Sequence, residues 1–102
     1  MRRKPWISST GLIEKLLKDP EVRICFEIER ARTELAAAVR GARQKADLTQ
    51  AELADRIGTS QSVIARLESG DDQRTPSLPL LAKIAKACHG NLEIRFKFQK
   101  AA

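Results

Sequence analysis

Residues 48–70 read LTQAELADRIGTSQSVIARLESG in one-letter code. Apolar residues at helical spacing lie on both sides of Gly58. Glycine reaches positive φ without the steric cost that other residues bear, so Gly58 suits a tight turn and Gly70 suits the end of a helix. The stretch therefore predicts one helix from Gln50 to Ile57 and a second from Thr59 or Ser60 to about Ser69.

The apolar positions of these two helices place them across each other around a shared core. Thr49 is a residue type that caps a helix start. Ala54 is small at the point where the helices must approach closely. The positions expected in the shared core are Leu53, Ile57, Ile64 and Leu67. Two crossed helices joined at a glycine are the arrangement of a helix-turn-helix.

The outer face of the second helix carries Gln61, Ser62 and Arg66. Glutamine can form two hydrogen bonds to adenine and arginine can form two to guanine. We therefore expect these side chains to contact base edges in a major groove. Gln50 lies at the start of the first helix, where free backbone amides attract a phosphate, and is expected to join them.

Many positions at fixed spacing carry a resemblance to a known family. They are Thr49-Gln50, Glu52-Leu53-Ala54, Gly58, Gln61, Ile64, Leu67-Glu68, Gly70, Thr75-Pro76-Ser77-Leu78 and Ile84-Ala85-Lys86-Ala87. In these positions the chain resembles the Cro/C1-type helix-turn-helix repressors over roughly residues 34–90. The resemblance implies an all-α, lambda-repressor-like domain of five helices.

The resemblance also implies roles for individual side chains toward double-stranded DNA. Bases would be read by Gln61, Ser62 and Arg66, and phosphates would be held by Gln50, Thr59 and Ser60. Members of this family pair an arginine of the helix that precedes the helix-turn-helix with a glutamate that ends the recognition helix, and Arg43 and Glu68 occupy these places. Glu52 is expected to cap its helix or to lie on the surface. Val63 departs from the polar residue often found there, and either contacts a thymine methyl group or packs.

Three parts are expected along the chain: an N-terminal extension over residues 1–33, the helix-turn-helix domain over 34–90, and a C-terminal strand and tail over 91–102. The extension includes a short helix from Ser8 to Lys18. A further helix begins at Asp19-Pro20 and reaches about Ala46, either unbroken or as two helices joined near Thr33. Within the domain, Ser77 caps a last helix that ends at Cys88 or His89.

The C-terminal part alternates apolar and charged residues, which is the spacing of a strand with one apolar face. The apolar positions are Leu92, Ile94, Phe96 and Phe98. A lone strand cannot satisfy its backbone, and the chain offers no second strand. Pairing with the same strand of a second copy about a twofold axis is therefore expected, so the sequence predicts a homodimer.

The layout of these parts is similar to that of HigA-type antitoxins, which bind a RelE/ParE-like (HigB-type) ribonuclease toxin and repress their own operon. This resemblance implies that the N-terminal extension binds a toxin. The anchors would be Trp6, Ile7, Leu12, Ile13, Leu16 and Leu17, with Phe26 extending the contact. The alternative is that the N-terminal helix folds back on its own domain or lengthens a dimer interface.

The net charge of +6 suits a polyanionic partner, although residues 47–69 alone carry a net −2. No apolar run is long enough for a membrane span, and no signal peptide is evident, so a cytoplasmic protein is expected. Cys25 and Cys88 have no metal-ligand spacing and are interpreted as reduced core thiols. The single histidine, His89, has no catalytic partners nearby, so neither enzymatic activity, a cofactor nor a metal is expected.

The sequence is thus interpreted as a dimeric transcriptional repressor that binds a palindromic operator and serves as the antitoxin of a toxin–antitoxin pair. Two alternatives stay open. One is a stand-alone repressor without a toxin partner, and the other is a toxin-neutralising protein whose DNA binding is weak. The negative charge of residues 47–69 is the reason to keep the second.

Overall fold

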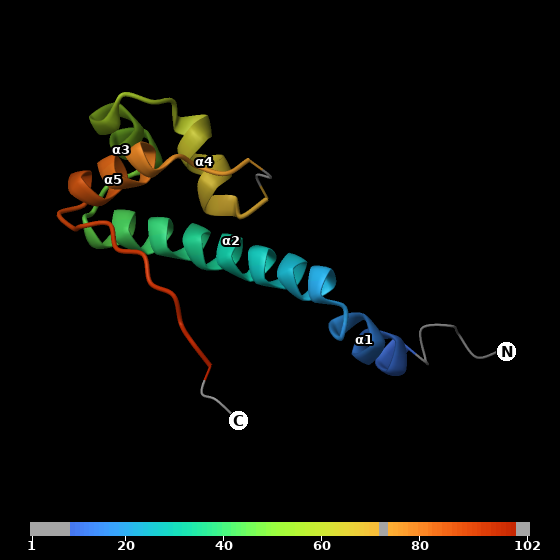
Figure 1. Cartoon of the computed structure of the whole chain (residues 1–102). Helices are drawn as coiled ribbons and strands as arrows, with labels where there is room; N and C mark the ends of the chain where they lie inside the picture. Colours follow the sequence, from blue (N-terminus) through green and yellow to red (C-terminus); the bar gives the residue numbers. More distant parts are fainter. Residues whose placement is uncertain (1–8, 72–73, 100–102) are drawn as a thin grey trace, which may run out of the picture. The chain divides into compact units, whose positions relative to one another are not determined.

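The computed structural model describes residues 9–71 and 74–99, and these contain five helices (Figure 1). The helices are α1 (Ser9–Leu17), α2 (Pro20–Lys45), α3 (Gln50–Ile57), α4 (Gln61–Ser69) and α5 (Leu78–Ala87). The chain divides into two compact units between Glu34 and Leu35. Residues of α2 belong to both units.

The first unit contains α1 and the first part of α2. Asp19 and Pro20 begin α2 as the sequence predicts, because Asp19 Oδ1 accepts a hydrogen bond of 2.9 Å from the Glu21 amide and proline needs no donor there. The helix then runs without a break to Lys45, so the alternative of two helices joined near Thr33 is wrong.

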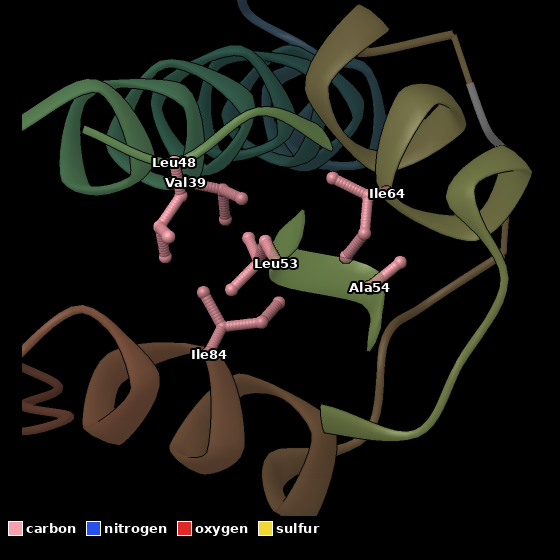
Figure 2. Packing of buried hydrophobic residues seen from close by; sticks show 6 residues of the cluster. All are labelled: Val39, Leu48, Leu53, Ala54, Ile64 and Ile84. Carbon is pink, nitrogen blue, oxygen red and sulfur yellow. The ribbon is translucent and has the colours of Figure 1, made fainter. Parts of the chain in front are cut away.

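The second unit holds the hydrophobic core. Leu53 of α3 and Ile64 of α4 have no exposed surface, and Ile84 of α5 is 3% exposed. These side chains point toward one another from three helices (Figure 2). The full buried cluster is Val39, Leu48, Leu53, Ala54, Ile64 and Ile84. Ile57 and Leu67 are only partly buried and pack at its edge, so the core predicted for the two short helices is confirmed.

Local caps fix where α3 and α5 begin. Thr49 Oγ1 accepts from the Glu52 amide at 3.0 Å, and Glu52 Oε1 accepts from the Thr49 amide at 2.8 Å. This reciprocal pair is a capping box, which satisfies two backbone donors at once. Ser77 Oγ accepts from the Leu80 amide at 3.2 Å. The capping roles predicted for these residues are confirmed.

The expected C-terminal strand is not formed in the single chain. Residues 91–99 belong to neither a helix nor a strand (Figure 1). A strand exists only where a neighbouring strand accepts and donates its backbone hydrogen bonds, and no other strand is present in residues 9–71 and 74–99. The alternation of apolar and charged side chains is therefore present in the sequence, but it does not produce a strand within the single chain.

The helix-turn-helix domain also contains fewer helices than expected. Between Leu35 and the last described residue lie the end of α2 and the three helices α3, α4 and α5, so the count of five is reached only by including α1. A second correction concerns the thiols. Cys25 is exposed and not part of a core, because it lies in the part of α2 that has no buried residue. Cys88 is half-buried, and burial raises the pKa of its thiol.

Candidate nucleic-acid interface

A left-handed residue at the end of α3 sets the direction in which α4 departs. Gly58 has φ 73° and ψ 37°, and the Thr59 amide donates to the Ala54 carbonyl oxygen at 2.9 Å. This is the positive-φ turn predicted from the sequence. Gly70 ends α4 in the same way with φ 76°. The two glycines thus bound a nine-residue helix whose inner side is anchored by Ile64 in the core.

The outer side of α4 carries the side chains expected to contact bases. Gln61, Ser62 and Arg66 are all exposed. Ser60 and Ser62 share a hydrogen bond between their hydroxyl oxygens at 3.1 Å, and Ser60 makes no cap to the helix amides. Val63 is half-buried, which favours its packing role. The first turn of α4 contains no acidic residue, so its start presents amide donors and a hydroxyl pair without a carboxylate from the same turn.

The residues expected to hold phosphates do not share one environment. Thr59 is half-buried and Ser60 is exposed. Gln50 is half-buried, and its Nε2 atom donates to Glu68 Oε1 at 3.1 Å. The side-chain amide of Gln50 is therefore held by the protein itself, between the start of α3 and the end of α4, which restricts where its second N–H can point.

Glu68 is the centre of a buried polar network that joins three helices. Its side chain is 4% exposed. Arg43 contacts it with two hydrogen bonds, from Nε to Oε2 at 2.6 Å and from Nη2 to Oε1 at 3.0 Å. Arg43 Nη1 also donates to the Leu48 carbonyl oxygen at 2.8 Å. The ion pair that the family resemblance implied is confirmed, and it ties α2 to the end of α4.

The backbone of Glu68 is part of the same network, because Arg40 Nη1 donates to its carbonyl oxygen at 2.8 Å. Burial by itself would raise the pKa of Glu68, but hydrogen bonds from Arg43 and Gln50 and the nearby charges outweigh it, so the pKa lies below the ordinary glutamate value. The hydrogen bond to Glu68 raises the pKa of Arg43 in turn, against the opposing effect of burial. Both groups therefore stay charged near neutral pH.

This network reduces the part of the negative charge of residues 47–69 that faces the solvent. Glu68 is the only acidic residue in α4, and it is turned inward and neutralised by Arg43, which lies outside that stretch. Glu52 is held in the capping box of α3. The face of α4 that carries Gln61 and Arg66 therefore presents no carboxylate of its own helix.

Arg74, which lies beside this face, was not singled out from the sequence. A hollow of about 210 Å³ lies next to Arg66. Its lining residues are Val63, Arg66, Leu67, Arg74, Thr75, Pro76, Ser77 and Leu80. The match at Thr75-Pro76-Ser77 was the available signal, because it placed a polar loop directly after α4. Arg40 was also missed, since nothing in its spacing predicts a bond to a carbonyl oxygen 28 residues away.

Other kinds of site find no support in the described parts of the chain. In residues 9–71 and 74–99, no three His, Cys, Asp or Glu side chains gather as a metal would require. Among the helices described, none combines the length and apolar character needed to cross a bilayer.

Comparison with known proteins gives one match. A family model described as helix-turn-helix matches residues 39–94, which is more than half of the 102-residue chain. Searches of curated proteins and of solved structures returned no match. The matched range begins in the last turns of α2 and includes α3, the Gly58 turn, α4 and α5. The chain therefore belongs to the Cro/C1-type helix-turn-helix family of DNA-binding transcriptional regulators.

Proposed function

We propose that the protein is a sequence-specific repressor that inserts α4 into the major groove of a palindromic operator. Gln61, Ser62 and Arg66 read base edges in this proposal, and Gln50, Thr59 and Ser60 hold phosphates. The observation that carries it is the face of α4, which exposes an amide, a hydroxyl and a guanidinium while its one carboxylate is buried against Arg43. A regulator of this kind works where the DNA is, so a cytoplasmic location forms part of the proposal.

The buried position of Glu68 also bears on the alternative of weak DNA binding. That alternative rested on the net −2 of residues 47–69. Because Glu68 is paired inside the protein, its charge does not repel phosphates as an exposed carboxylate would. The exposed cation of α4 is Arg66, which favours a helix that contacts DNA.

The test is binding of the full chain to the DNA upstream of its own gene, compared with random DNA at the same salt concentration. Arg66→Ala should weaken binding to the specific site by about 1–3 kcal/mol and relax the preference at one base pair. Arg30→Ala removes the same charge from the first unit and is the matched control. Equal weakening on specific and random DNA would refute the base-reading role of Arg66.

We also propose that the repressor acts as a homodimer through its C-terminal segment. Phe96 and Phe98 are 83% and 85% exposed, and contiguous exposed aromatic surface is costly unless a partner covers it. Arg95 Nη2 donates to Glu93 Oε1 at 3.0 Å, two residues away, which agrees with charged side chains on one side of an extended backbone. Leu92 and Ile94 complete the alternate positions.

Antiparallel pairing of two such segments would give each a strand partner and would relate two copies of α4 by a twofold axis. Half-sites would then be spaced by one turn of DNA, ~34–36 Å, or a multiple of it. Sedimentation equilibrium tests this. Phe96→Ser should yield monomers, whereas Phe26→Ser, a loss of an exposed aromatic ring in the first unit, should leave the dimer intact. A dimer that survives Phe96→Ser would exclude this mode of pairing.

We propose as the finer role that the protein is an antitoxin whose N-terminal part binds a RelE/ParE-like ribonuclease toxin. Support comes from the apolar residues of this part that are exposed in the described residues of the first unit. Their exposed fractions are Leu12 55%, Ile13 48%, Leu16 43% and Leu17 40%, whereas Trp6 and Ile7 lie outside the described residues. A hollow of about 370 Å³ adjoins Leu17 and Phe26. The layout resemblance to HigA-type antitoxins supplies the identity of the partner.

Co-expression with the product of the neighbouring reading frame, followed by affinity capture, tests this role. The double variant Leu12→Asp/Leu16→Asp should lose the captured protein, while Phe96→Ser in the C-terminal segment should retain it. If the wild-type chain does not capture the neighbouring product, the result would support the alternative of a stand-alone repressor. Toxin capture without binding to the chain's own promoter would instead support the toxin-neutralising alternative.

A further inference from the structure

A second exposed surface of the helix-turn-helix unit lies between α3 and α5. It is an open groove of about 670 Å³. Its lining residues are Arg56, Ile57, Ala82, Lys83, Lys86 and Ala87. We call it the α3–α5 groove. None of its residues belongs to the set expected to read bases or hold phosphates.

The groove combines an apolar floor with a cationic rim. Ile57, Ala82 and Ala87 are partly buried and present aliphatic groups, while the exposed residues are all cations. The methylene stems of lysine and arginine extend the apolar walls and leave the charged ends at the rim. None of the described residues that line the groove carries a carboxylate. Lys86 Nζ donates to Asn91 Oδ1 at 2.9 Å, which holds one ammonium group in place.

We propose that the α3–α5 groove binds an acidic amphipathic helix of a partner protein. Three cations around an apolar floor complement a helix whose apolar stripe is flanked by glutamate or aspartate. The small side chains of Ala82 and Ala87 let such a helix approach the floor closely. The volume lies in the range of specific ligand sites and is large enough for several side chains of the stripe.

Two other occupants fit this surface less well. Nucleic-acid backbone is bound chiefly through hydrogen-bond donors, and the aliphatic floor of the groove offers it none. In the proposed dimer a second copy binds through the C-terminal segment, and none of the residues assigned to that contact lines the floor or the cationic rim of the groove. A partner with excess carboxylates is attracted by the same rim.

The probe is a synthetic helical peptide with leucine at positions i, i+3, i+4 and i+7 and glutamate at the other positions. Titrated into the isotope-labelled full chain, it should shift NMR signals of Ile57, Ala82 and Ala87. Lys83→Glu/Lys86→Glu should weaken its binding by about tenfold or more, since two attractive rim charges become repulsive. Lys15→Glu/Lys18→Glu changes the net charge equally in the first unit and should change the affinity less than twofold.

Circular dichroism first establishes that Lys83→Glu/Lys86→Glu is folded. Arg56→Gln, on the opposite wall of the groove, is a milder variant that should also weaken binding of the peptide. A permuted peptide of identical composition without the leucine stripe should not bind. Equal binding of the permuted peptide, or unchanged affinity in the Lys83/Lys86 variant, would overturn the proposal.

Two further measurements separate the competing occupants. A 12-base-pair duplex should shift signals of α4 and leave Ala82 and Ala87 unaffected, and shifts in the groove would make it a phosphate surface. Sedimentation of Lys83→Glu/Lys86→Glu should match that of the wild-type chain. Loss of self-association in that variant would show that a second copy covers the groove and would refute a partner helix. The outcome is independent of whether Arg66 reads bases.

Discussion

Replacing the carboxylate of Glu68 should destabilise the helix-turn-helix unit severely, because the change leaves a buried guanidinium without its counter-charge. In Glu68→Gln, one of the two acceptors used by Arg43 becomes an amide nitrogen, and the acceptor shared by Arg43 and Gln50 is weakened or lost. The Arg43 side chain is only 14% exposed, so water cannot replace the lost interaction fully. Removing one partner of such a pair costs about 3–5 kcal/mol.

That loss is a large share of the 5–15 kcal/mol by which domains of this size are usually stable, and it corresponds to a decrease in Tm of about 12 °C or more. Urea unfolding followed by circular dichroism measures it. Glu27→Gln is the matched control, because Glu27 also accepts from an arginine at a comparable distance, 2.9 Å from Arg30, but both side chains are 66% exposed. The control should lose less than about 1 kcal/mol. If the two variants lose the same stability, burial is not what gives the Glu68 network its strength and the reasoning fails.

Three more predictions concern local geometry and pH. Gly58→Ala should lower the free energy of unfolding by about 1–2 kcal/mol because φ is 73°, whereas Gly41→Ala near the end of α2 should raise it by about 0.5–1 kcal/mol. A Cβ meets nothing within 4 Å at either position, so urea unfolding of the two variants measures the backbone contribution, and changes of the same sign would contradict it. Thr49→Ala removes the acceptor for the Glu52 amide and should cost about 1 kcal/mol in the same assay, with no effect expected if α3 does not depend on its capping box. The pKa of Glu68 is lowered on folding, so the stability it contributes is present above the unfolded value of about 4.3 and is lost as pH falls through the lower folded value. The difference in unfolding free energy between wild type and Glu68→Gln should therefore shrink below about pH 4.3, and a constant difference down to strong acid would disprove the assignment.

Features set by a few neighbouring residues could be predicted from the sequence. The turn at Gly58, the helix end at Gly70 and the caps at Asp19, Thr49 and Ser77 each depend on contacts within about four residues. Such local capping and turn preferences follow from the residue types alone. The periodicity of apolar side chains likewise identified Leu53 and Ile64 as the shared core, because burial of one helix face follows from spacing alone.

Features that depend on a distant or second segment could not be predicted in the same way. The alternation from Leu92 to Phe98 describes a strand only if a partner strand is supplied, and the described part of the chain supplies none. Cys25 is exposed because the first part of α2 contains no buried residue. The residue types of this part did not show that its apolar side chains stay outside the core. The hydrogen bond from Gln50 to Glu68 joins residues 18 apart, so it required the fold to be known.

The contrast between Glu68 and Arg66 shows why a sum of formal charges misjudges this surface. The two residues lie two positions apart in α4. Even so, the helix turns Glu68 into the protein against Arg43 and leaves Arg66 exposed. A charge that is paired and buried contributes little to the field outside, whereas an exposed charge acts on whatever approaches. The negative total of residues 47–69 therefore does not describe the face of α4. The same reasoning applies to the α3–α5 groove, where Arg56, Lys83 and Lys86 all lie at the exposed rim and act together. The partners of each face are determined by the charges that the fold leaves exposed to water. Which charges are exposed depends on which side of each helix faces the solvent, and composition does not give this.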